Sequence, residues 1–216
     1  SVIMDELEIL KKDWKKNENA FDQVTEKEIY GMLHKRSSSI VKWILIISII
    51  EFIFWNIIAV VFSDEKYQTK LKNYGIEDIM TIVNIVNYVI VVGFIYVFYK
   101  NYRSISTLDS TRKLMQSIVS TRRTVRNYIW YNLFIITVTI VISIYMMFTH
   151  NPDMIALMNQ QVAAGHESVF VCFCVALSIV FIAAIIGIFW LFYKLLYGVL
   201  LKKLFTNYKE LKKIEL

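Results

Sequence analysis

The sequence predicts an all-α polytopic membrane protein, with four transmembrane helices and cytoplasmic helical extensions. Three observations predict this class. The chain has 216 residues, of which 56% are hydrophobic, and its mean hydropathy is +0.49. Four apolar runs are each long enough for the roughly 20 residues that a helix needs to cross a bilayer. The basic residues gather in alternate segments between these runs. An ordinary soluble globular domain is therefore excluded.

The four runs contain no proline, and an unbroken apolar run satisfies its backbone hydrogen bonds within lipid as a helix. We place the spans at about 40–62, 79–99, 128–149 and 168–193. The predicted organisation has three parts. Cytoplasmic amphipathic helices at 1–38 precede a four-helix transmembrane bundle at 39–199, and a cytoplasmic helical tail follows at 200–216. The bundle includes a cytoplasmic hairpin at 100–127.

The distribution of Lys and Arg predicts the orientation. Of the 24 basic residues, 21 lie in segments 1–42, 100–126 and 194–216, three lie in 63–78 and none lies in 150–167. Cytoplasmic loops carry the excess of basic residues in membrane proteins. Both termini and the hairpin are therefore expected in the cytoplasm, and the expected location is the inner membrane of a bacterium.

Periodic apolar residues predict helices outside the spans. Two short amphipathic helices are expected before the first span. The first carries a stripe at 3, 7, 10 and 14, and the second begins at a capping box formed by Thr25 and Glu28. The hairpin and the tail continue the spans as helices, on apolar faces formed by Ile105, Leu108, Met115, Ile118 and Val125 and by Leu200, Leu204, Tyr208 and Leu211.

Glu51 lies at the middle of the first predicted span, where an uncompensated charge costs about 2.5–3.5 kcal/mol. The carboxyl is therefore expected inside the bundle, near polar groups of other spans. No Lys, Arg or His lies in the central part of any span to pair with it. The polar residues expected around Glu51 are Ser48, Asn84, Asn87, Tyr88, Asn132, Thr139 and Ser143.

Two interpretations of Glu51 remain open from the sequence. In the first, the carboxyl is a proton or cation site. In the second, it is a neutral acid that holds helices together through hydrogen bonds to Asn and Thr, each contributing about 1–2 kcal/mol or less.

The basic hairpin is interleaved with aliphatic rather than stacking aromatic residues, which favours a lipid surface over nucleic acid. The residues expected to contact anionic lipid headgroups or a protein partner are Arg103, Arg112, Lys113, Arg122, Arg123 and Arg126. An acidic excess in residues 1–28 complements this charge, so the N-terminal helices are expected to pack against the hairpin.

No motif predicts catalysis or a cofactor. His150, Asp153, His166 and Glu167 are acceptable ligand types for a divalent ion, but the gap of 16 residues between the two histidines does not match a compact metal motif. No nucleophile arrangement is evident, because every histidine lies outside the spans. The sequence therefore predicts neither a metal site nor an enzyme.

The opening MDELEILKKDWKK, the juxtamembrane IYGMLHKRSSSIVKWI and the hairpin segment TRRTVRNYIWYNL resemble small four-span inner-membrane proteins of flavobacteria and relatives. Members are often labelled β-carotene monooxygenases. Such oxygenases resemble a β-propeller with four iron-binding histidines, whereas this chain has three histidines, so the label is rejected here. The resemblance implies no established activity.

The expected function is that of a non-enzymatic membrane-tethered regulator, scaffold or accessory subunit, whose cytoplasmic helices dock a protein partner. The alternative is an oligomeric ion channel or transporter that uses Glu51. A homo-oligomer is compatible with both.

Overall fold

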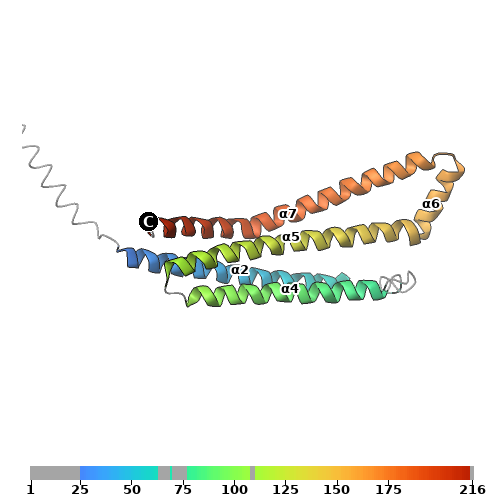
Figure 1. Ribbon diagram of the computed structural model, residues 1–216. Helices are drawn as coiled ribbons and strands as arrows, with labels where there is room; N and C mark the ends of the chain where they lie inside the picture. Colours follow the sequence, from blue (N-terminus) through green and yellow to red (C-terminus); the bar gives the residue numbers. More distant parts are fainter. Residues whose placement is uncertain (1–24, 63–68, 70–76, 108–109, 215–216) are drawn as a thin grey trace, which may run out of the picture.

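The computed structural model describes residues 25–62, 69, 77–107 and 110–214, and these residues form five helices (Figure 1). The bounds are α2 Glu26–Phe62, α4 Glu77–Ser106, α5 Thr111–His150, α6 Pro152–Ala163 and α7 Glu167–Ile214. Within the described ranges there is no strand. The all-helical fold class predicted from the sequence is confirmed.

The four long helices alternate in direction and form an up-down-up-down bundle. α2 packs against α4 and α7, and α5 packs against the same two helices. Over the residues that the structure describes, these four helices are long and apolar enough to cross a membrane, whereas α6, with 12 residues, is too short. We call the end of the bundle that carries Lys42, Lys100, Arg126 and Lys194 the basic end, and the opposite end the α6 end.

Local sequence signals set where the helices begin and end. The predicted capping box forms at the start of α2, where the Thr25 backbone N–H donates to Glu28 Oε2 (2.8 Å) and the Glu28 N–H donates to Thr25 Oγ1 (3.3 Å). Asn151 caps α6 by accepting from the Asp153 N–H (3.0 Å), ahead of Pro152. Gly165 follows α6 with a φ of 76°, a conformation that glycine adopts without steric cost.

α2 runs unbroken from Glu26, so the second short amphipathic helix is not separate from the first span. Residues 34–39 contain no proline or glycine that would end it. The first short helix, with its stripe at 3, 7, 10 and 14, lies outside the described residues, and so does the predicted packing of residues 1–24 on the hairpin. The predicted continuations of the other spans are confirmed: α4 extends to Ser106, α5 begins at Thr111 and α7 extends to Ile214.

The buried core lies in the basic half of the bundle. Its centre contains Val41, Ile44, Phe98, Ile118 and Leu204, which are completely buried. On α5 every buried residue lies between Leu114 and Leu133, and α6 has none. Toward the α6 end α7 diverges from α5 (Figure 1), and its buried residue there is Cys174. Most apolar side chains of this half are therefore not covered by other parts of the described chain.

Candidate functional site

Glu51 lies inside the bundle, bonded to three tyrosines from two other helices. Tyr193 donates its hydroxyl to Glu51 Oε1 (2.6 Å), while Tyr128 and Tyr197 donate to Oε2 (3.1 and 2.9 Å). Glu51 is 6% exposed, and each tyrosine is at most 1% exposed. We call these four residues the tyrosine cluster. The cluster joins α2 to α5 and α7 through hydrogen bonds from tyrosine hydroxyls to the carboxyl. Because these bonds are buried, each is electrostatically stronger than the same bond at a surface.

Helical spacing positions the tyrosines. Tyr193 and Tyr197 are one turn apart on α7, so both face α2, and their rings stack with centroids 6.2 Å apart. The Tyr128 ring meets both of them edge to face, at 6.5 and 6.0 Å. Phe98 of α4 packs edge to face on Tyr128 from the other side. Each hydroxyl is therefore held in place by its own ring contacts.

The prediction that Glu51 meets polar groups of other spans agrees with this geometry, but its hydrogen-bond partners are the three tyrosines and not the residues that were expected around it. Two of the expected residues bond to polar residues of other helices, and four bond to their own helix. Tyr88 donates to Asn56 (2.8 Å) and Tyr131 donates to Asn87 (2.9 Å). The remaining donors reach backbone carbonyls of their own helix, namely Ser48 to Leu45, Asn132 to Tyr128, Thr139 to Ile135 and Ser143 to Thr139.

The depth of Glu51 explains the difference. Glu51 bonds to Tyr193, which is next to Lys194 on α7, and to Tyr128, which is two residues after Arg126 on α5. Lys194 and Arg126 mark the ends of the uncharged stretches of these two helices. Glu51 lies nine residues beyond Lys42 on α2, about 13 Å along a helix. The four spans therefore do not share one midpoint, and the tyrosines at the predicted ends of two spans lie level with the middle of the first.

Several predicted polar residues line a cavity beside Glu51. Its volume is about 260 Å³, and its polar lining consists of Glu51, Trp55, Asn56, Asn84, Asn87, Tyr88, Tyr128, Asn132 and Tyr193. A neighbouring cavity of about 300 Å³ is lined by Thr139 and shares Asn84, Asn87 and Phe189 with the first. Ser48 and Ser143 line neither. We call the first of these the polar cavity.

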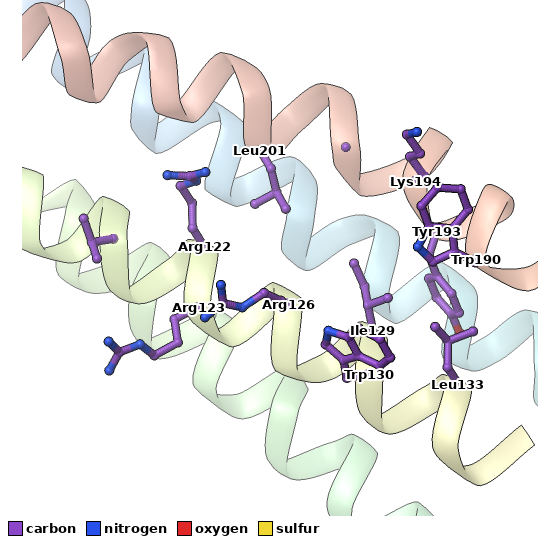
Figure 2. A pocket seen from close by; sticks show the side chains of 12 residues that line it. Arg122, Arg123, Arg126, Ile129, Trp130, Leu133, Trp190, Tyr193, Lys194 and Leu201 are labelled. Atoms are coloured by element: carbon purple, nitrogen blue, oxygen red, sulfur yellow. The ribbon is translucent and has the colours of Figure 1, made fainter. Parts of the chain in front are cut away.

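A second candidate site is a groove of about 470 Å³ between α5 and α7 (Figure 2), and Tyr193 lines both this groove and the polar cavity. We call it the basic groove. Its lining is Val119, Arg122, Arg123, Arg126, Ile129, Trp130, Leu133, Trp190, Tyr193, Lys194, Gly198 and Leu201. Four of these side chains are cationic and none is acidic.

Aromatic rings hold two of the four cations. The Arg122 guanidinium lies 4.2 Å from the centroid of the Phe205 ring, and Lys194 Nζ lies 4.6 Å from that of Trp190. Figure 2 shows Arg122 extending from α5 toward α7, whereas Arg123 points away from α7. Arg122 Nε is buried without a hydrogen-bond partner. The groove therefore contains a positioned guanidinium with an unused donor.

Of the six basic residues predicted to contact lipid or a partner, the structure brings Arg122, Arg123 and Arg126 into the groove. Arg103, Arg112 and Lys113 are not among its lining residues. Sequence reasoning did not place Lys194, Trp130 or Trp190 in a site with these arginines; Lys194 and Trp190 come from the middle of α7 and Trp130 comes from α5. The available signal was that Arg126 and Lys194 are the first charges beyond the long uncharged stretches of these two helices.

The four metal-ligand candidates do not form a site in the described residues, where no group of three or more His, Cys, Asp or Glu side chains could hold a metal ion. His150 ends α5, Asp153 lies in the first turn of α6, and His166 and Glu167 lie at the start of α7. α6 separates the two pairs, and the sequence had not predicted this helix.

The fold and these sites define a helical protein with four helices able to cross a membrane and with a buried carboxyl that joins three of them. The chain belongs to the family described as a domain of unknown function (DUF8845), whose family model matches residues 27–216. No curated protein and no solved structure matches the chain significantly.

Proposed function

We propose that this protein is a non-enzymatic integral membrane protein that acts as a membrane-tethered regulator, scaffold or accessory subunit. The observation that carries the proposal is the position of its core. Buried side chains continue past Lys202 on α7 to Leu204 and Leu211, and they meet Leu33 and Leu114, which are buried on α2 and α5. Crossing a membrane does not require a packed core beyond the apolar stretches, so this helical layer fits a docking platform.

Polar contacts support the same interpretation of the layer. His34 Nε2 lies 2.6 Å from the carbonyl oxygen of Ile105, and the Asn207 amide donates to Ser37 Oγ (3.1 Å) within the core. These bonds fix α2 against the ends of α4 and α7. A layer held by specific polar contacts presents a constant surface, which partner recognition requires.

We propose that the basic end faces the cytoplasm, with the protein in a bacterial inner membrane. The test uses Ser120→Cys and Gln160→Cys, each with Cys172 and Cys174 replaced by Ser. In intact cells, a membrane-impermeant thiol reagent is expected to label position 160 and not position 120, and to label both after lysis. Labelling of position 120 in intact cells would contradict this orientation.

A photo-crosslinking residue placed at exposed positions of the layer tests the platform itself. Lys113 and Ser120 are suitable positions, and Gln160 on α6 is the matched control. The expected result is a discrete protein adduct from the layer positions only. Adducts of equal yield from position 160 would contradict docking at the layer.

The alternative is a channel or transporter, and the polar cavity is the specific observation in its favour because it contains Glu51 and four asparagines. On the basic side of Glu51, three tyrosine rings and Phe98 are buried together, so a conducting path would require their displacement. Liposome flux measurements separate the two functions. Proton or cation flux in the wild type that Glu51→Gln abolishes, with the fold retained, would replace the platform proposal.

A further inference from the structure

The basic groove lies at the depth of lipid headgroups on the two helices that form it. Residues 127–149 of α5 and 168–193 of α7 contain no charged side chain. Arg126 and Lys194 are the first charges beyond these stretches, and both line the groove. Trp130 and Trp190 lie beside them, and tryptophan favours the interface between hydrocarbon and water. A molecule in this groove therefore lies at the membrane boundary.

The groove combines a cationic part with an apolar part. Arg122, Arg126 and Lys194 supply the positive charge, and Ile129, Leu133 and Leu201 supply an aliphatic surface next to it. Gly198 leaves the α7 backbone open, because a Cβ there would meet only Lys194 Cγ, at 3.6 Å. A small soluble anion would use the first part alone, whereas a phospholipid uses both.

The cations are available to a ligand. None of the lining residues is acidic, so no carboxylate of the groove competes for the cations. The Arg122 guanidinium rests on the Phe205 ring, and because its unpaired Nε–H is buried, a ligand in the groove would bind its other N–H groups. Guanidinium groups bind phosphate oxygens through paired hydrogen bonds, and a positioned one loses less entropy on doing so. The volume of about 470 Å³ lies within the range of ligand pockets.

We propose that the basic groove binds one anionic glycerophospholipid, with its phosphate between Arg122, Arg126 and Lys194 and an acyl chain along Ile129 and Leu133. Basic pockets between transmembrane helices suit such headgroups. A zwitterionic lipid fits less well because its ammonium group meets the same cations. The bound lipid would bridge α5 and α7 beside Tyr193, which also lines the polar cavity. This inference does not depend on the proposed platform function.

The experiment places the full chain in phosphatidylcholine vesicles that contain a few per cent of acyl-brominated phosphatidylglycerol, and measures quenching of tryptophan fluorescence. The reference is the same amount of brominated phosphatidylcholine. The wild type is expected to prefer phosphatidylglycerol by at least about tenfold, given about 1 kcal/mol per basic residue. The double variant Arg122→Gln/Arg126→Gln is expected to lose this preference. The matched control Arg112→Gln/Lys113→Gln removes the same charge from exposed positions outside the groove and is expected to keep it within twofold.

Each other outcome overturns the proposal. Equal losses in the two double variants would mean general surface attraction. Wild type without preference would mean that the groove is empty or already filled, for instance by the acidic N-terminal segment. Competition by millimolar inorganic phosphate or glycerol phosphate would assign the groove to a soluble phosphate. If the groove double variant does not fold, Lys194→Gln provides the same test with one charge removed, and an unchanged preference there contradicts the site.

Discussion

The two halves of the bundle differ in how they are held together, although the same four helices form both. In the basic half, residues such as Ile44, Ile105 and Leu204 are fully buried, and the tyrosine cluster closes this core. In the α6 half, residues such as Val169, Ile179 and Ile188 are more than half exposed, and cavities separate the helices. Helix packing within the chain stabilises the first half, whereas lipid must cover most of the second. The comparison predicts that sensitivity to substitution changes abruptly near Glu51.

The largest effect is expected at the boundary itself. Glu51→Leu would leave three buried tyrosine hydroxyls without an acceptor, at a cost of about 4 kcal/mol in the free energy of unfolding. Glu51→Gln should cost less, because the amide still offers one acceptor oxygen and can donate to a tyrosine oxygen. Reversible unfolding in mixed detergent micelles measures both. Ser48→Ala is the control, since its hydroxyl bonds only to its own helix, and a comparable loss in that variant would refute the role assigned to the cluster.

Next in size is a matched pair of leucines on α7. Leu204→Ala creates a cavity in the packed half and should destabilise the protein by about 3 kcal/mol. Leu177→Ala removes the same atoms from a side chain that is 59% exposed and should change stability by less than about 0.5 kcal/mol. Unfolding in micelles measures the difference. Equal effects of the two substitutions would remove the distinction between the halves.

A smaller effect is expected from the hydrogen bond between Asn207 and Ser37. Asn207→Ala leaves the buried Ser37 hydroxyl without this partner and should cost about 1 kcal/mol. Thr206→Ala is the neighbouring control, because that exposed hydroxyl bonds to the Lys202 carbonyl of its own helix. Hydrogen exchange of α2 amides near Ser37 should accelerate in the first variant alone. Unchanged exchange there would show that the bond between Asn207 and Ser37 does not help to join this part of α2 to α7.

The smallest effect concerns the first turn of α2. The Thr25 backbone N–H and hydroxyl both donate to Glu28, which lowers the pKa of that carboxyl below its ordinary value of 4.5. The ionised form is thus favoured in the folded state. The contribution of the ionised Glu28 to the stability of the first turn is therefore present above about pH 4.5, and it is lost as the pH falls further, through the lowered pKa. Amide exchange in the first turn should accelerate in that range, and Thr25→Ala should weaken the pH dependence without abolishing it, because the hydroxyl bond is lost while the backbone N–H still donates to Glu28. A change confined to the range above pH 5 would contradict this assignment.

Most of the helical architecture could be predicted from the sequence, because apolar length and periodicity are local properties. Ile118, Val125, Leu204 and Leu211 were placed on buried faces, and all four are buried. Near the start of α2, Leu33 is buried whereas the neighbouring Met32 is 58% exposed, since one turn of pattern does not fix the direction of the face. Helix α6 was missed because its apolar stretch is shorter than a span.

The partners of Glu51 could not be predicted, because they depend on how far each helix slides along its neighbours. A one-dimensional estimate aligned the spans by their midpoints, and this brought Asn84 and Asn132 near the carboxyl. The packed helices place Asn84 and Asn132 in the cavity beside Glu51, but they align the carboxyl itself with Tyr193 and Tyr197, at the end of the longest uncharged stretch. Axial offset between helices is a tertiary property, fixed by side-chain packing along the whole interface. Lys194 joined the basic groove for the same reason.

The unequal uncharged stretches have a consequence for the bilayer. Residues 43–62 of α2, apart from Glu51, and 79–99 of α4 are about 30 Å long as helices, which matches a hydrocarbon core of roughly that thickness. Residues 168–193 of α7 would span about 39 Å, and a helix longer than the core accommodates the excess mainly by tilting. An upright pair beside a tilted helix would make a wedge, and α7 does diverge from α5 toward the α6 end (Figure 1). In a bilayer, such a wedge would occupy a larger area in the leaflet at the α6 end than in the leaflet at the basic end.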